Sequence, residues 1–276
     1  MLLYAAFVAL FLVLWACFAP TLPLLRRAGA LAAHLIARAS LRWARVGHLA
    51  SRFRDYLPVA AVVIGGAFLT AWAGDGFLDL AELVRDKNPA VQDFDALVHA
   101  WAISRRSAAS TSFFSVMTTI GSPPALAALG VCAGILLLLT HRYRWLLYLA
   151  VTAGGGALLD LELKRFFARA RPDVAEMLRQ AHGYSFPSGH AMGSTVMLGA
   201  LSYLAFRTLS RWRWKSAAFA LAWTLIAAIS TSRVYLGVHW LSDVVAGITA
   251  GAMWVGVTTV AYETLRRIRM LRVTAT

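Results

Sequence analysis

The fold is most clearly indicated by residues 216–243, which read SAAFALAWTLIAAISTSRVYLGVHWLSD. The part before Arg233 is uncharged and mostly apolar, and a second apolar run, 240–262, begins within the same stretch. A helix needs roughly 20 mostly apolar residues to cross a bilayer. We therefore interpret the stretch as the end of one membrane-spanning helix, a short connection that carries Arg233 and His239, and the start of another that carries Asp243.

The composition of the whole chain is that of a membrane protein. The chain has 276 residues, of which 59% are hydrophobic and 14% charged, and its mean hydropathy is +0.64. A soluble domain carries about 25% charged residues. The formal net charge of +14 could indicate nucleic-acid binding, but the basic residues lie between apolar runs rather than on one polar domain. We exclude a nucleic-acid partner and expect anionic lipid headgroups at the cytoplasmic face.

Seven apolar runs are candidate spans, and they predict an all-α polytopic membrane protein with a six-helix transmembrane core and one extra N-terminal transmembrane helix. The runs are 2–24, 57–73, 113–139, 145–163, 189–206, 216–232 and 240–262. Prolines in Gly121-Ser122-Pro123-Pro124 are expected to kink or shorten the third run, because proline removes a backbone donor. We divide the chain into an N-terminal helix with a basic cytoplasmic segment (1–56), the membrane core (57–262) and a basic cytoplasmic tail (263–276).

The connecting segments differ in charge. Arginine and lysine concentrate in 26–54, 141–144, 207–215 and the tail, which fall on one side if all seven spans are real. An excess of basic residues marks the cytoplasmic side. The segments 74–112, 164–188 and 233–239 then lie outside the cytoplasm. Segment 28–54 is either an amphipathic helix on the inner surface or a plain basic loop.

The first polar motif is Lys164 followed, after six residues, by Arg171-Pro172. Lys164 at a helix end is either a snorkelling anchor or a specific cation. Arg171 can bind phosphate oxygens with both arms of its guanidinium group. We interpret the neighbouring Arg165 and Arg169 as interfacial anchors.

The second motif is Pro187-Ser188-Gly189-His190, where a loop enters the fifth span. Ser188 is a plausible N-cap, and the free N–H groups of a helix N-terminus form an anion site. Gly189 would let a phosphate approach the backbone closely. His190 could protonate a leaving oxygen. The alternative is an ordinary capped helix start with an interfacial histidine.

The third motif is Ser232-Arg233, then His239 and Asp243, which are four residues apart and would share one face of a helix. A carboxylate that accepts from one imidazole nitrogen leaves the other nitrogen as a base or nucleophile. A structural polar pair or a metal site are the alternatives, and the metal site lacks convincing further ligands. We assign no role to the remaining histidines, which are His34, His48, His99, His141 and His182.

Together the three motifs resemble the signature of the type 2 phosphatidic acid phosphatase superfamily, in its bacterial integral-membrane branch. The superfamily also contains the soluble vanadium haloperoxidases, whose role is disfavoured here because the chain is mostly spans. The resemblance covers roughly residues 57–262, and more loosely Asp93-Phe94-Asp95 and Gly121 ahead of the signature. It does not cover 1–56.

The resemblance implies a role for each matched position. His239 would be the nucleophile that forms a phosphohistidine, Asp243 would orient it, and His190 would be the general acid. The phosphate would be held by Lys164, Arg171, Ser188, Gly189 and Arg233. No metal or other cofactor is implied, because the cations supply the charge stabilisation.

We therefore expect a metal-independent lipid phosphatase in the bacterial cytoplasmic membrane, with its site facing the periplasm or cell exterior. Undecaprenyl diphosphate is the favoured substrate, and phosphatidylglycerol phosphate and phosphatidic acid follow it closely; this ranking rests on the family alone. A lipid phosphotransferase would use the same residues. A non-catalytic lipid-binding protein or transporter is the alternative of a different class.

Overall fold

The computed structural model describes residues 2–18, 31 and 57–274, so most of the basic segment 26–54 lies outside the described residues. Within these ranges the chain forms nine α-helices, one short 3₁₀ helix and no β-strand, which confirms the all-α prediction. The helices are α1 (Leu2–Phe18), α4 (Leu57–Arg85), α5 (Pro89–Ser104), α6 (Ala108–Ile120), α7 (Pro123–Leu139), α8 (Tyr143–Phe167), η1 (Val174–Glu176), α9 (Gly189–Thr208), α10 (Trp212–Tyr235) and α11 (Leu241–Thr274).

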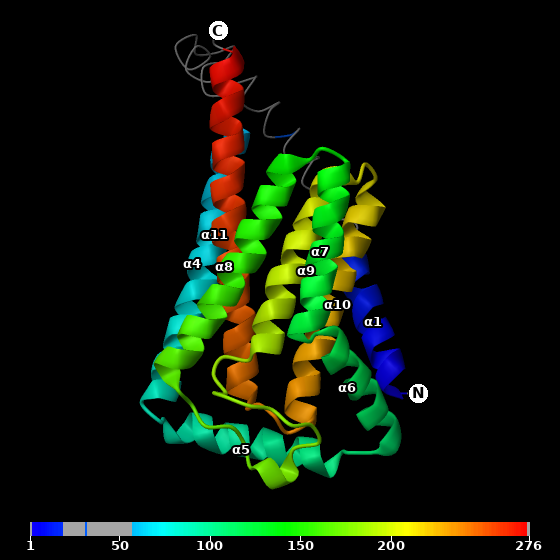
Figure 1. The fold of residues 1–276 in the computed structure, drawn as a ribbon, viewed down its shortest axis with the longest axis vertical. Helices are drawn as coiled ribbons and strands as arrows, with labels where there is room; N and C mark the ends of the chain where they lie inside the picture. The colour runs from blue at the N-terminus through cyan, green and yellow to red at the C-terminus, as the bar shows by residue number, and fades with distance from the viewer. Residues whose placement is uncertain (1, 19–30, 32–56, 275–276) are drawn as a thin grey trace.

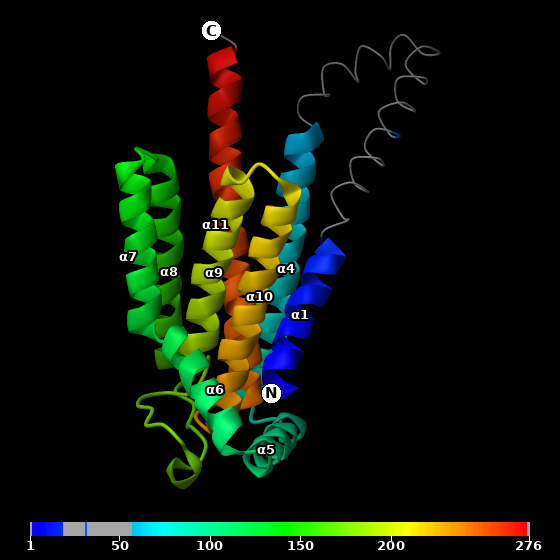
Figure 2. The same ribbon diagram turned by 90° about the vertical axis from the view of Figure 1, so that its right-hand side faces the viewer.

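The long helices run side by side as a bundle (Figures 1 and 2), and α5 lies across one end of it. The loop between α8 and α9 and the turn between α10 and α11 lie at that same end. The turns that connect α7 to α8 and α9 to α10 lie at the opposite end. The segments that carry the three polar motifs are therefore gathered at one end of the bundle.

Three described helices are long and apolar enough to cross a membrane: Tyr143–Phe167, Trp212–Tyr235 and Leu241–Arg269. A fourth span arises if α6 and α7, which bend by 49° at their junction, are taken together. The bend is where the two prolines predicted a kink. There the side chain of Ser122 caps α7, and Pro123 occupies its first turn, where a missing N–H costs nothing. The full set of seven spans stays a prediction.

Two helices continue beyond the predicted spans. The span predicted to end at residue 73 continues as α4 to Arg85, and the last span continues as α11 to Thr274. In α11, Glu263 binds Arg266 at 2.9 Å one turn ahead and accepts from the Tyr203 hydroxyl of α9 at 2.5 Å. Because residues three and four apart on a helix are neighbours, these ion pairs support helical structure past the apolar run.

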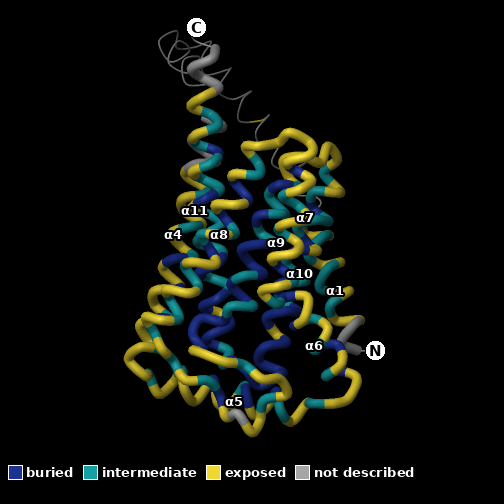
Figure 3. The backbone as a smooth tube through the Cα atoms, viewed as in Figure 1, coloured by how far each residue is buried: buried dark blue, intermediate teal, exposed yellow. Residues whose placement is uncertain are grey.

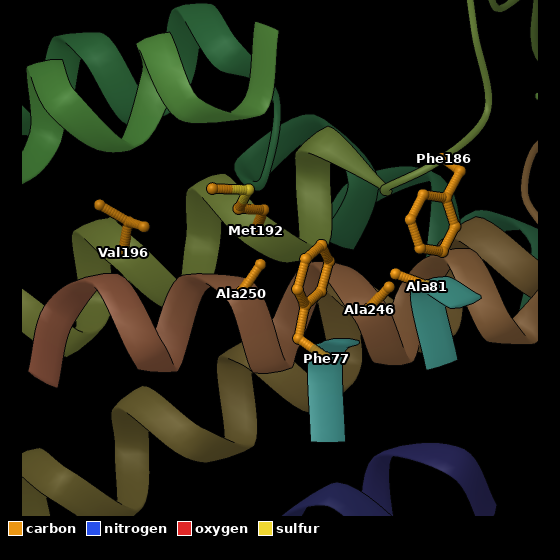
Figure 4. Packing of buried hydrophobic residues seen from close by; sticks show 7 residues of the cluster. All are labelled: Phe77, Ala81, Phe186, Met192, Val196, Ala246 and Ala250. Carbon is orange, nitrogen blue, oxygen red and sulfur yellow. The ribbon is translucent and has the colours of Figure 1, made fainter. Parts of the chain in front are cut away.

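Helix α9 is the centre of the bundle, and its residues are among the most deeply buried ones (Figure 3). Just above the polar end, Met192 of α9 packs with Phe77 of α4, Phe186 of the α8–α9 loop, and Ala246 and Ala250 of α11 (Figure 4). The small alanines let α9 and α11 approach closely, and the core fixes where α9 begins. The position of Ser188 and Gly189 thus depends on this packing.

We expect Gly247→Ala in α11 to destabilise the protein by about 1–3 kcal/mol, the usual cost of overpacking a core. A Cβ at this position would lie 2.7 Å from the carbonyl oxygen of Ser188 and 3.1 Å from the Ala191 Cβ. Backbone cannot move aside cheaply, so α9 would shift. The melting temperature in detergent measures the effect. Gly154→Ala in α8 is the control, because the added Cβ meets nothing within 4 Å. Its melting temperature should equal that of the wild type or lie slightly above it.

Candidate active site

Arg171 and His239 meet at the polar end of the bundle. The Arg171 Nη1 lies 3.1 Å from the His239 Nε2 and donates to the Val238 carbonyl oxygen at 2.8 Å. Its other nitrogens donate to the carbonyl oxygens of His182, Gly183 and Tyr184, so this one side chain ties the α8–α9 loop to the α10–α11 turn. The first and third motifs are therefore in direct contact.

The contact with Arg171 determines the form of the His239 imidazole. Guanidinium only donates, so the His239 Nε2 accepts and the proton lies on Nδ1, which faces Asp243. His239 is 2% exposed, and burial lowers its pKa to about 4, with Arg233 and Arg171 also lowering it and Asp243 raising it. The imidazole is thus neutral near pH 7, with an unprotonated Nε2 that accepts from Arg171.

Asp243 is fully buried and accepts four hydrogen bonds. Its Oδ2 lies 3.4 Å from the His239 Nδ1, accepts from the Trp240 N–H at 2.9 Å, and accepts from the Ser185 hydroxyl. Its Oδ1 accepts from the Arg169 Nη1 at 2.6 Å. His239 and Asp243 are thus in contact, although His239 lies in the turn before α11 rather than on the helix. The carboxylate is held rigidly toward the imidazole.

The prediction that Arg169 is an interfacial anchor is wrong. Its side chain is 17% exposed and bridges two buried carboxylates, Asp243 at 2.6 Å and Asp95 of α5 at 2.9 Å. Asp95 in turn accepts from the Ser242 N–H at 2.9 Å. Two carboxylates buried this deeply require a cationic partner, and Arg169 supplies it. Arg165, by contrast, is exposed and pairs with the exposed Glu162.

We expect Arg169→Met to lower kcat by about 10- to 100-fold, the usual effect of losing a group that orients a functional ligand. Without the guanidinium group, Asp243 loses its 2.6 Å partner and can turn away from His239. Arg165→Met removes the same charge from an exposed position and should leave kcat unchanged. Steady-state kinetics of the two variants measure the difference. Equal activity of both would show that Arg169 does not position Asp243.

The second motif forms the start of α9 as predicted. Ser188 is the N-cap residue, but its side chain makes no capping hydrogen bond, and its buried Oγ has no partner among the described residues. Its backbone N–H donates to the Asp243 carbonyl oxygen at 2.9 Å, which joins the second motif to the third. The first turn of α9 therefore presents free N–H groups and an unused hydroxyl, the chemistry of an anion site.

The remaining predicted residues surround this helix start. Lys164, at the end of α8, lies against Gly189 and pairs with Asp160 at 2.5 Å. Arg233 is 6% exposed and donates to the Thr118 hydroxyl of α6. His190 lies within electrostatic range of Arg233, His239, Lys164 and Arg171. All eight predicted residues thus belong to one cluster.

Sequence inspection missed four contributors to the cluster: Arg169, Asp95, Ser185 and His99. Ser185 bridges to Asp243, and His99 of α5 binds Glu176 at 2.8 Å and packs on Trp240. Two sequence signals pointed to them. One was the looser resemblance at Asp93-Phe94-Asp95, and the other was the alternation Arg169-Ala170-Arg171, which in an extended loop places both guanidinium groups on one side. The described residues contain no group of three His, Cys, Asp or Glu side chains able to hold a metal ion.

A cavity of about 800 Å³ adjoins the cluster, between the α4–α5 turn and the loop that follows α8. Arg171, Arg169 and Trp240 line its inner wall, and Phe166 and Phe167 line another part of it. The cavity is thus amphipathic and shares Arg171 with His239. It offers space beside the cluster for a molecule with a polar and an apolar part.

Comparisons with known proteins identify the family of the chain. Residues 143–267 match the family model described as the PAP2 superfamily. Phosphatidylglycerophosphatase B of Bacillus subtilis is 31% identical over 180 residues, which cover 64% of this chain and 86% of the relative. An undecaprenyl-diphosphatase of Sulfolobus acidocaldarius is 38% identical over 88 residues, which cover 32% of this chain and only 38% of the relative.

A solved structure resembles the fold as well. The crystal structure of a transmembrane PAP2-type phosphatidylglycerolphosphate phosphatase from Bacillus subtilis superposes with a TM-score of 0.65 at 27% identity. The match covers 70% of this chain and 94% of that one. The matches to the two Bacillus subtilis phosphatases thus extend over most of each relative's length. The chain therefore belongs to the PAP2 superfamily and is an integral-membrane phosphatase of that group.

Proposed function

We propose that the protein hydrolyses phosphate or diphosphate groups of membrane lipids through a phosphohistidine at His239. One observation carries the proposal: the neutral His239 Nε2 faces Arg171 and the cationic cluster at the start of α9, with Asp243 fixed behind the other nitrogen. A nucleophile, an orienting carboxylate and a cationic cradle are the parts that covalent phosphoryl transfer requires.

In the first step the His239 Nε2 attacks phosphorus, and the bond from phosphorus to the leaving oxygen breaks. His190, protonated beside the bound phosphate anion, gives its proton to that oxygen, so the lipid alcohol or lipid phosphate leaves with its departing oxygen protonated. The imidazole becomes positively charged, and Asp243 stabilises it through Nδ1–H. Arg171, whose Nη1 lies 3.1 Å from Nε2, binds the phosphate oxygens.

In the second step water attacks phosphorus, and the bond between phosphorus and Nε2 breaks. His190, now neutral, takes the proton of the attacking water, which returns both histidines to their starting forms. Lys164, Arg171 and Arg233, with the Ser188 hydroxyl and the Gly189 N–H, hold the oxygens throughout. These groups fill the charge-stabilising role that metal ions fill in other phosphatases.

The names of the relatives suggest phosphatidylglycerol phosphate and undecaprenyl diphosphate as substrates, with phosphatidic acid as a third candidate. We place the lipid beside Arg171, in the amphipathic cavity, with its headgroup toward the arginines and its chain along Phe166 and Phe167. The site faces the periplasm or cell exterior of a bacterial inner membrane, in a chain of seven spans. The Arg-rich turns at the opposite end of the bundle support that orientation.

Phosphate release by detergent-purified protein tests the proposal, with the three lipids supplied separately in excess EDTA. We expect EDTA-resistant release from at least one lipid. Loss of release in EDTA, with recovery on adding metal, would contradict the metal-independent route. A balance of labelled phosphate separates a phosphatase from a phosphotransferase, because a transferase releases less free phosphate than the substrate it consumes.

A further inference from the structure

Asp160 is an acid inside the apolar helix α8 that the proposed reaction does not use. Its Oδ2 lies 2.5 Å from the Lys164 Nζ one turn later, and both side chains are about one-fifth exposed, at 21% and 20%. Its Oδ1 is buried and has no hydrogen-bond partner among the described residues. Ionisable groups within membrane spans are costly and mark functional positions.

The Asp160–Lys164 pair lies directly on the proposed phosphate cradle. A Cβ added to Gly189 would come within 3.0 Å of the Asp160 Oδ2 and would also collide with the Lys164 Nζ. Gly189 is the first residue of α9, where free N–H groups face an incoming anion. The carboxylate therefore occupies space at the helix N-terminus that a phosphate oxygen would approach.

Charge explains why a carboxylate at this place matters. The cradle combines Lys164, Arg171 and Arg233 with the partial positive charge of a helix N-terminus. Such a site also binds the product, inorganic phosphate, and must release it in every cycle. An anion that takes over Lys164 when phosphate leaves reduces the cost of emptying the cradle.

We propose that Asp160 is a positioning residue that competes with phosphate for Lys164 and thereby promotes product release. The inference rests on the proposed function, because it requires phosphate to bind at Gly189. The alternative is a purely structural role, in which Asp160 only anchors Lys164 within the membrane. The two roles differ in sign: loss of a competitor tightens phosphate binding, whereas loss of an anchor weakens it.

The test compares Asp160→Asn with Glu162→Gln, which removes the same charge two residues later from an exposed pair with Arg165. Inorganic phosphate and vanadate serve as competitive inhibitors. We expect Asp160→Asn to lower both inhibition constants about five-fold, the equivalent of one partly exposed ion pair. We also expect kcat and KM to fall together, because slower release limits turnover. Glu162→Gln should match the wild type.

Unchanged or raised inhibition constants in Asp160→Asn would overturn the inference. If the asparagine variant does not fold, Asp160→Ser replaces it, because serine removes the charge with a smaller side chain. The same fall in both inhibition constants is then expected. A wild-type protein that neither releases phosphate nor is inhibited by phosphate or vanadate would refute the proposed function itself. Normal wild-type inhibition with no difference between the Asp160 and Glu162 variants would refute only the role of Asp160.

Discussion

Replacing His239 by alanine is expected to lower phosphate release by about 10⁴-fold or more, the usual loss when a covalent nucleophile is removed. The His239 Nε2 is the nitrogen whose lone pair accepts from Arg171 at 3.1 Å, while Nδ1 faces Asp243. In the alanine variant no other imidazole takes that position against the carboxylate. Residual activity should come only from water positioned by the cationic cradle.

The loss must come from chemistry rather than unfolding. His141→Ala is the matched control, because His141 is exposed and lies in the α7–α8 turn at the opposite end of the bundle, where its ring hydrogen-bonds the Tyr143 hydroxyl at 2.9 Å. It should retain full activity, and both variants should elute from a sizing column like the wild type. Substantial turnover by a folded His239→Ala protein would refute His239 as the nucleophile.

Asp243→Asn should lower kcat by about 10⁴-fold, the effect of the equivalent change in a serine protease triad. The carboxylate accepts from the Trp240 N–H, Ser185, Arg169 and His239, so an amide must turn an N–H₂ group toward one of these donors. Either the Arg169 contact is lost or the His239 tautomer is wrong. An imidazole with its proton on Nε2 cannot attack phosphorus.

Steady-state kinetics in detergent measure this change, and the fall should be in kcat rather than KM, because Asp243 is buried behind His239. Asp79→Asn on α4 removes the same charge from an exposed position and should be silent. A reduction of ten-fold or less for Asp243→Asn would mean that the imidazole is oriented by other contacts, foremost Ser185 at 3.5 Å.

The three polar motifs were readable from the sequence because each is local. Lys164 lies in the last turn of α8 and Arg171 on the loop that follows it, and Ser188, Gly189 and His190 form one helix start. Alternation of apolar runs then predicts that these loops share one end of the bundle. The kink at Pro123 was likewise predicted, because proline acts on its own backbone.

The support behind the nucleophile could not be predicted in the same way. Arg169 pairs with Asp95 and Asp243, each 74 residues away, and no spacing rule connects such distant positions. The sequence offered instead an equally good local explanation for Arg169, an anchor at the membrane surface. Helix α5 places Asp95 there by crossing the end of the bundle, an orientation set by tertiary packing alone (Figure 1).

One experiment addresses the phosphohistidine itself. A lipid diphosphate labelled in its terminal phosphate is mixed rapidly with the protein, and the reaction is quenched in base, in which phosphohistidine survives. We predict that label appears on the protein before free phosphate, maps to His239, and is absent in His239→Ala. Release of phosphate without labelled protein, or label on another residue, would contradict the mechanism proposed here.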